Sequence, residues 1–197
     1  MKTPKKFYYL VLFALISFAF SFPINHMQEF FYKKVESNNF HNLYRINESV
    51  YRSEQPSKKG MKELKALGIK SILNLRRQQT DVKKIKGLDL QLDRIPLKAA
   101  TLDFEAIYKT LNSLQQAEKP VLVHCWHGSD RTGTIIAAYR MVFENWGKEK
   151  AINEFIDKPF GYHKTRFPNL VTLLDTLNVD LLKKKLKLEN MPNLNSN

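Results

Sequence analysis

The chain of 197 residues has a single cysteine, Cys125, which excludes an internal disulfide bond and any zinc cluster built on several cysteines. Seven glycines and eight prolines are few for this length, so collagen-like and low-complexity classes are excluded. Disorder is excluded too, because 43% of the residues are hydrophobic and 12% are aromatic, enough to offset the chain entropy lost on folding. The sequence predicts one domain held together by an apolar core.

One long apolar run is present, FYYLVLFALISFAF at residues 7–20, and it follows a short segment with three lysines and no acid. Such a start is typical of a secretory signal, and Ala19 and Ser21 are small residues suited to a cleavage site. The run is shorter than the roughly 20 residues that span a bilayer. We therefore predict a signal peptide at residues 1–21 and an exported protein, periplasmic or secreted. The alternative is an uncleaved anchor, with membrane association through residues 7–22.

The remaining chain divides into a linker at residues 22–39, a folded domain at residues 40–190 and a loose tail at residues 191–197. The whole chain has 32 basic and 19 acidic residues, which give a net charge of +13 spread along the sequence. The densest basic cluster, residues 183–187, is interpreted as a solvated helix face, and no nucleic-acid partner is predicted. A basic surface does attract anionic substrates.

Within the domain, hydrophobic periodicity alternates between strand-like and helix-like segments. Strands are expected at residues 43–46, 50–52, 69–75, 88–97 and 121–123. Helices are expected at residues 56–67, 103–117, 132–143, 148–156 and 169–186. This alternation, together with apolar strands, predicts an α/β fold with a central, mostly parallel sheet flanked by helices.

The segment that carries chemistry lies between the last strand and the helix that follows it. Its residues are His124, Cys125, Trp126, His127, Gly128, Ser129, Asp130, Arg131, Thr132 and Gly133. A loop at such a junction directs successive backbone N–H groups and a helix N-terminus to one point, which makes an anion-binding site. The same partial positive charge stabilises a thiolate on Cys125.

Five residues separate Cys125 from Arg131, enough for a loop to surround one tetrahedral dianion. The planar guanidinium of Arg131 can bind two phosphate oxygens at once. Thr132 places a hydroxyl beside the sulfur, able to donate to it. The alternative, that Cys125 is merely a small buried apolar side chain, leaves the Arg-Thr pair at this offset from the only cysteine unexplained. We therefore predict a nucleophilic thiolate and a substrate-binding loop at residues 126–131.

His-Cys-x5-Arg-Thr-Gly is the signature loop of cysteine-dependent phosphatases, and the chain resembles the dual-specificity branch of the protein tyrosine phosphatase superfamily, especially its small bacterial members. The resemblance covers roughly residues 40–175 and includes YRSEQP at 51–56, GIKSILNLR at 68–76 and GYH at 161–163. It implies the protein tyrosine phosphatase fold. It also implies hydrolysis of phosphotyrosine, with phosphoserine and phosphothreonine as further substrates, in a phosphorylated protein or a small phosphomonoester.

The resemblance implies a mechanism of two steps. Cys125 attacks phosphorus to give a phosphocysteine intermediate, while the amides of residues 126–131 and the Arg131 guanidinium hold the equatorial oxygens. A general acid protonates the leaving oxygen and then, as a base, activates water. His124 lies behind the thiolate as a hydrogen-bond partner. No cofactor is implied, and no metal, since the sequence has no His/Asp cluster with ligand spacing.

The general acid is where the sequence departs from the family. Relatives place an aspartate on the loop after the strand that ends here near Pro96, but this loop reads LKAAT at residues 97–101. Asp93 comes too early, within the strand. Asp130, inside the phosphate-binding loop as in myotubularin-like phosphatases, is the first candidate, with a salt bridge or loop brace as its structural alternative. Asp103 is the second, with a helix cap as its alternative.

Two other functions stay open. An inositol phosphate or phosphoinositide phosphatase fits the basic surface, although the loop lacks the interior lysines of phosphoinositide-specific relatives. A phosphate-binding pseudophosphatase follows if no residue serves as the acid. Sulfur transfer is disfavoured, because rhodanese-like loops are shorter and lack the Arg-Thr-Gly ending.

Overall fold

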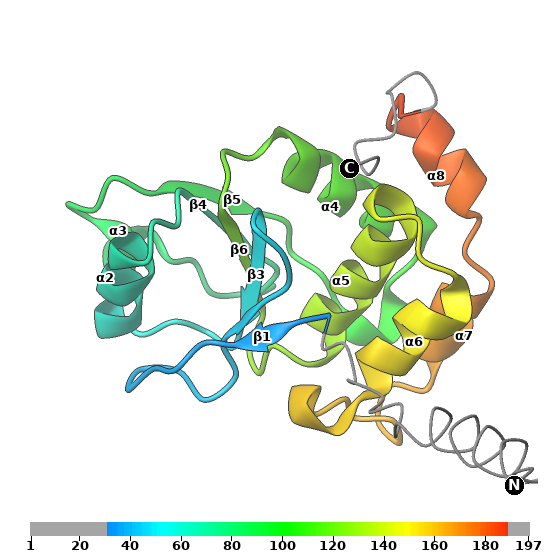
Figure 1. Cartoon of the computed structure of the whole chain (residues 1–197), viewed down its shortest axis with the longest axis horizontal. Helices are drawn as coiled ribbons and strands as arrows, with labels where there is room; N and C mark the ends of the chain where they lie inside the picture. Colours follow the sequence, from blue (N-terminus) through cyan, green and yellow to red (C-terminus); the bar gives the residue numbers. More distant parts are fainter. Residues whose placement is uncertain (1–30, 189–197) are drawn as a thin grey trace, which may run out of the picture. The chain divides into compact units, whose positions relative to one another are not determined.

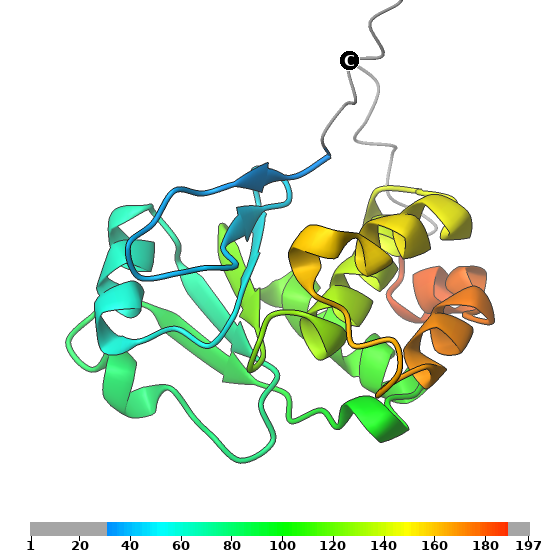
Figure 2. The ribbon, with the colours of Figure 1, turned by 90° about the horizontal axis from the view of Figure 1, so that it is seen from below.

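The computed structural model describes residues 31–188, so the predicted signal peptide or anchor and the predicted tail lie outside the described range. These residues form one sheet of six strands with helices on both faces (Figures 1 and 2). The strands are β1 (Lys33–Lys34), β2 (Tyr44–Arg45), β3 (Val50–Ser53), β4 (Ser71–Asn74), β5 (Gln91–Arg94) and β6 (Val121–His124). Their spatial order is β1-β2-β3-β6-β4-β5. No helix in the described range is long and apolar enough to cross a membrane.

The sheet is mostly parallel, as the sequence predicts. Strands β3, β6, β4 and β5 run parallel to one another, while β1, β2 and β3 form antiparallel pairs at one edge. The β2–β3 hairpin turns at Asn47, whose side chain accepts the N–H groups of Ser49 and Val50 at 2.8 Å each. This confirms the two short strands expected at residues 43–46 and 50–52, which the structure pairs antiparallel.

The helices form two unequal layers (Figures 1 and 2). They are α2 (Lys58–Ala66), α3 (Val82–Ile85), α4 (Phe104–Gln116), α5 (Asp130–Phe143), α6 (Lys148–Ile156), α7 (Asn169–Asp175) and α8 (Val179–Lys185), with short 3-10 turns at Ala99–Thr101 and Lys158–Phe160. One face of the sheet packs against α2 and α3, and the other faces α4 and α5, with α6, α7 and α8 packed on the outer side of α5. Both faces of the central strands are therefore buried.

Alternation along β6 accounts for the two layers. Val121 and Val123 belong to the larger core with α4 to α8, and Leu122 belongs to the smaller core with α2. Successive side chains of a strand point to opposite faces, so a strand covered on both sides needs an uninterrupted apolar run. The apolar run of β6 ends at Val123; His124 is the last residue of the strand, and the polar loop follows it.

Two expectations from the sequence require correction. The helix expected at residues 169–186 is divided into α7 and α8, because Asn178 begins a new helix by accepting the N–H of Leu181 at 2.9 Å. Leu177 between them is 3% exposed, so the break turns an apolar side chain into the core. Lys33 and Lys34, placed in a linker by the sequence, form β1 and pair with β2.

Candidate active site

The loop that follows β6 lies at the carboxyl end of the sheet, between the ends of β3 and β4. His124 is in register with Ser53 of β3 and with Asn74 of β4. Helix α5 begins at Asp130, so the loop joins the end of a central strand directly to a helix N-terminus. This is the edge of a parallel sheet at which α/β proteins bind ligands.

Four successive carbonyl groups of the loop accept hydrogen bonds from outside it. The donors are His124 Nδ1 to the oxygen of Cys125 (3.1 Å), the Gln55 N–H to Trp126 (2.9 Å), Asn42 Nδ2 to His127 (2.8 Å) and Arg52 Nη2 to Gly128 (2.7 Å). In a trans peptide the N–H of the next residue points the opposite way. The N–H groups of residues 126–129 therefore point into the loop, where an anion would sit.

The loop continues into the first turn of α5, which adds the N–H groups of Asp130 and Arg131. Helix N–H groups in that turn have no acceptor within the helix, and they carry the positive end of the helix dipole. The predicted anion site is thus formed by consecutive amides, as residues 126–131 were expected to provide. Their roles toward a substrate remain predictions.

Gly128 gives the loop its close approach to β3. Its φ is +75°, in the left-handed region, and a Cβ at this position would lie 2.6 Å from the carbonyl carbon and oxygen of Ser53. Glycine has no Cβ and adopts a positive φ readily, so no other residue type fits at this position. The turn at Gly128 therefore depends on glycine for two independent reasons.

Arg52 is a buried cation behind the loop, only 1% exposed. Its guanidinium lies 3.9 Å from the centre of the Phe160 ring while it donates to Gly128. Burial lowers the pKa of Arg52 to about 10, although the charges of Glu154 and Cys125 act in the opposite direction. Arg52 is therefore still positive near neutral pH and places a fixed charge beside the loop.

Cys125 is 2% exposed, and a charge on its sulfur interacts with the guanidinium groups of Arg52 and Arg76. Arg131 is half-buried, with Nη1 at 3.4 Å from the Leu75 oxygen and 3.5 Å from the Leu97 oxygen. These contacts are long, so they orient the guanidinium without saturating its five donors. Arg131 keeps donors for an anion.

A pocket of about 340 Å³ borders the loop at Trp126, Asp130 and Arg131, and Cys125 is not part of its lining. Its charged lining consists of Arg76, Arg77, Lys98, Asp130, Arg131 and Arg166. Trp126 and Phe167 line it with aromatic rings, and Trp126 is 56% exposed. The Arg76 guanidinium lies 4.2 Å from the Trp126 ring centre. The pocket therefore combines five cations and one carboxylate with aromatic surface.

The two candidate acids lie in different surroundings. Asp130 lines the pocket, and its carboxylate accepts the N–H of His163 at 3.0 Å and faces His163 Nδ1 at 2.9 Å. This is the loop brace that was its structural alternative. Asp103 caps α4 by accepting the Ala106 N–H at 2.8 Å, and it is absent from the pocket lining. Asp93 lies in β5, as expected, beside Ser113.

Two supporting residues lie at the two ends of the loop. The Thr132 hydroxyl is buried and has no hydrogen-bond partner among residues 31–188, so its donation to the Cys125 sulfur stays a prediction. His124 lies directly before Cys125, but its ring bonds to the Cys125 carbonyl and to Asp81 instead of the sulfur. The physical reason is that the Cys125 carbonyl and the Asp81 carboxylate engage both ring nitrogens.

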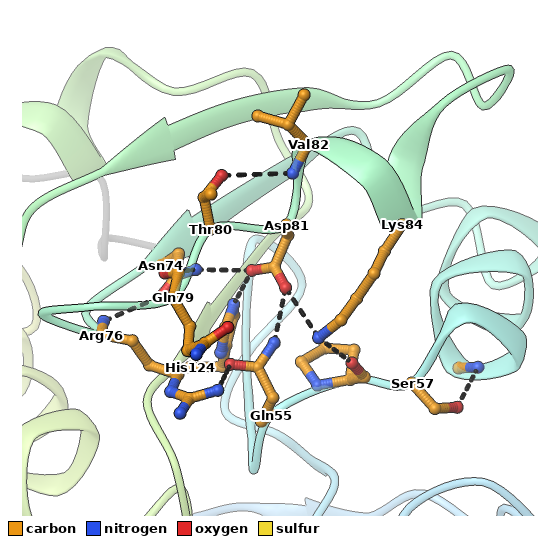
Figure 3. Close-up of polar contacts among 12 residues, drawn as sticks. Gln55, Ser57, Asn74, Arg76, Gln79, Thr80, Asp81, Val82, Lys84 and His124 are labelled. Atoms are coloured by element: carbon orange, nitrogen blue, oxygen red, sulfur yellow. Dashed lines mark hydrogen bonds and ion pairs between the residues drawn. The ribbon is translucent and has the colours of Figure 1, made fainter.

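Sequence reasoning missed the residues that hold the loop from behind. Asp81 is the centre of a buried network that includes His124, Gln55 and Asn74 (Figure 3). Asn42 and Arg52 were not assigned roles either. The available signal was His124 itself, since a histidine at the end of a buried strand needs polar partners.

A cysteine and an arginine at the two ends of a loop of inward-pointing amides, between a parallel strand and a helix, define the class of cysteine-based phosphate-binding enzymes. Residues 50–169 match the family model described as "Dual specificity phosphatase, catalytic domain", and the chain belongs to this family. No cluster of three potential metal ligands exists within residues 31–188.

Relatives agree with this assignment. The chain is 33% identical over 122 residues to the dual specificity protein phosphatase TpbA of Pseudomonas aeruginosa, covering 61% of this chain and about half (56%) of that protein. The crystal structure of P. aeruginosa TpbA in complex with pTyr superposes with a TM-score of 0.69 and 26% identity, over 78% of this chain and 99% of that one. The catalytic core of the PP-IP phosphatase SIW14 from S. cerevisiae shares the fold, with a TM-score of 0.63 and 23% identity over 80% and 97% of the two chains.

Proposed function

We propose that the protein is a cysteine-dependent phosphatase that hydrolyses phosphotyrosine, and also phosphoserine and phosphothreonine, through a phosphocysteine intermediate. The observation that carries the proposal is the set of four outward carbonyl groups, which turns the amides of residues 126–129 toward one point beside Cys125. Family membership and the phosphotyrosine held by TpbA support the choice of substrate.

The first step is attack of the Cys125 thiolate on phosphorus. Inward amides and Arg131 hold the three equatorial oxygens, so charge that redistributes during attack meets donors already in place. The sulfur–phosphorus bond forms as the bond to the leaving oxygen breaks, and the acid supplies a proton to that oxygen. Asp130 stays the first candidate for the acid because it lines the pocket and Asp103 does not.

The second step is attack of water on the phosphocysteine, which releases inorganic phosphate and restores the thiolate. The deprotonated acid takes a proton from the water. Aromatic side chains at the pocket, Trp126 and Phe167, would contact the ring of a phosphotyrosine. This is the feature that favours an aryl phosphate over an alkyl one.

A second candidate substrate is an inositol phosphate. Five cationic side chains line the pocket, more than one phosphomonoester requires. Charges spaced around one loop would bind a ligand that carries several phosphates, and such binding weakens as salt is added. The cationic lining is the specific observation in favour of this alternative.

The substrates can be separated in one panel. The purified protein and Cys125→Ser are assayed under reducing conditions on an aryl phosphate, on matched phosphotyrosine, phosphoserine and phosphothreonine peptides, and on inositol phosphates. We expect turnover of the aryl phosphate and the phosphotyrosine peptide. Preference for inositol phosphates would support the second candidate. A wild-type protein no faster than Cys125→Ser on any substrate would leave only a phosphate-binding pseudophosphatase.

A further inference from the structure

Asp81 is a carboxylate with 0% side-chain exposure behind the phosphate-binding loop, surrounded by donors (Figure 3). Its Oδ1 accepts from Gln55 Nε2 at 2.5 Å and from Lys84 Nζ at 3.0 Å. Its Oδ2 accepts from Asn74 Nδ2 at 2.6 Å and faces His124 Nε2 at 2.9 Å. Each oxygen thus has two donors, which leaves no acceptor for a proton on the carboxylate. Asp81 is therefore ionised.

The surroundings of His124 determine its protonation state. Nδ1 faces the Cys125 carbonyl oxygen, which can only accept, and Nε2 faces the ionised carboxylate of Asp81, which can also only accept. Both ring nitrogens must therefore donate. His124 is an imidazolium, paired with Asp81 in a buried ion pair directly before Cys125.

The pKa of Asp81 agrees with an ion pair. Burial raises this pKa, but hydrogen bonds and positive charge from His124 and Lys84 outweigh burial and lower it to about 2. A buried carboxylate with such a low pKa needs close cations, because burial alone favours its neutral form.

Asp81 also reaches the loop by a second route, through Gln55. The Gln55 side chain donates to Asp81 while its backbone N–H donates to the Trp126 carbonyl. Its Oε1 accepts from Arg76 Nη1 at 2.8 Å, and Arg76 lies over the Trp126 ring in the pocket. Two of the four outward carbonyl groups and one pocket cation are thereby connected to a single carboxylate.

We propose that Asp81 is a positioning residue of the phosphatase reaction, whose carboxylate keeps His124 positively charged beside Cys125 and holds the loop through Gln55. The proposal rests on the proposed function for its role in turnover. Asp81 does not touch substrate, since it is fully buried behind the loop and both its oxygens are bonded to other side chains. It acts on the thiolate through His124, because a nearby positive charge favours the ionised sulfur.

Two other charged groups act on Asp81: Lys84 from α3, which contacts it, and Arg76 after β4, whose charge interacts with both Asp81 and the Cys125 sulfur. Both are positive, so the Asp81 carboxylate is the negative partner that Nε2 of His124 contacts. In Asp81→Asn the new amide can donate to Nε2 of a neutral His124, which still donates to the Cys125 carbonyl, while the bond from Asn74 is lost. The substitution therefore removes the charge while keeping the contact between residue 81 and His124.

The test is the pH dependence of Cys125 alkylation by iodoacetamide in the full-length protein, followed by intact mass. Cys125 is the only cysteine, so every adduct reports this residue. We expect the midpoint of the rate profile to move upward by about one pH unit in Asp81→Asn, because the thiolate loses a neighbouring cation. Lys84→Met is the matched control: it removes a donor to Asp81 but keeps His124 and Gln55, so its midpoint should move much less.

An unchanged midpoint in Asp81→Asn, or equal shifts in both variants, would overturn the proposal. If Asp81→Asn does not fold, ¹⁵N spectra of the histidine rings in the wild-type protein decide, with His124 assigned by its loss in His124→Gln. Two protonated nitrogens at neutral pH are expected, and a neutral tautomer would overturn the proposal. Neither readout needs turnover, so a shifted midpoint in an inactive protein would contradict the proposed function and the role of Asp81 in turnover, but would support its effect on the Cys125 thiolate.

Discussion

At the scale of single residues, the loop depends on backbone carbonyl groups that donors from distant parts of the chain hold in place. Asn42, Arg52 and Gln55 come from the first third of the chain, and their acceptors are carbonyl oxygens of residues 126–128. A backbone carbonyl has no sequence signature, which is why these partners could not be read from the sequence. The cysteine and arginine could, because their identity and spacing are themselves the chemical requirement.

Gly128→Ala is expected to lower the free energy of unfolding by about 2 kcal/mol or more, because the new Cβ would lie 2.6 Å from the Ser53 backbone at a positive φ. Activity toward an aryl phosphate should fall with it, since the turn aims the loop amides. Gly68→Ala is the control: φ there is +84°, but nothing lies within 4 Å of the added Cβ. It should cost about 1 kcal/mol and leave activity intact. Equal losses of activity in the two variants, measured with urea unfolding and initial rates, would contradict this account.

Asp130→Asn is expected to reduce kcat/KM on an alkyl phosphate, a poor leaving group, by on the order of 10²–10⁴-fold, and to have far less effect on an aryl phosphate with a good one. The reason is that only a poor leaving group needs a proton as its bond breaks. Asp103→Asn is the matched control, since asparagine caps a helix as well as aspartate does. Should Asp103→Asn show the dependence on leaving group and Asp130→Asn not, the ranking of the two acids is wrong.

At the scale of elements, periodicity predicted the strands and helices that surround the site, and it failed where one polar residue interrupts an amphipathic pattern. Helix α6 occupies the predicted residues, and α4 begins after the predicted cap, Asp103. The segment at 169–186 keeps helical spacing of its leucines, but Asn178 offers its side chain to the backbone and begins α8. Hydrophobic periodicity reports only which face of a segment is apolar. A side chain that bonds to backbone groups can begin a new helix without changing that periodicity.

Asn178→Ala is expected to lower the free energy of unfolding by about 1 kcal/mol, because the Leu181 N–H loses its acceptor. Asn178→Asp should restore most of that loss, since aspartate provides the same oxygen. Urea unfolding of the three proteins measures both effects. Equal stability of Asn178→Ala and the wild-type protein would show that this cap does not hold α8.

The contact between Asp81 and His124 joins two distant elements, and no local sequence pattern predicts it. Asp81 comes just before α3 and His124 ends β6, so the pair is separated by 43 residues. Nothing in either segment alone indicates the other. The pairing arises because β4 and β6 are adjacent and the chain after β4 returns across their carboxyl ends. The sequence therefore specified the loop and the sheet that carries it, but the buried acid behind it required the topology.

At the scale of the whole molecule, stability in acid should depend on Asp81. Its pKa falls from 3.8 to about 2 on folding, so its ionised form contributes stability above pH 4, and this contribution is lost as the pH falls through the interval down to 2. The loss amounts to about 2 kcal/mol. Urea unfolding at pH 5, 4, 3 and 2 should show a steeper decline for the wild-type protein than for Asp81→Asn. Parallel declines would mean that another group governs acid stability.

Part of the positive charge of the chain lies at the pocket. A net charge of +13 named no partner by itself, but five cations face the pocket beside the loop. Family, fold and pocket together indicate a phosphate-bearing partner for the basic surface, which the composition alone did not identify. The positive charge therefore affects which substrates bind, and it does not determine the fold.

The central claim is that Cys125 becomes phosphorylated during turnover. Mixing the protein with an aryl phosphate, quenching in acid within milliseconds and measuring the intact mass tests it most directly. We predict a fraction of the protein carrying one phosphoryl group, mapped to Cys125 and absent from Cys125→Ser. Turnover by the wild-type protein with the phosphoryl group on another residue, or undiminished turnover by Cys125→Ser, would contradict the account.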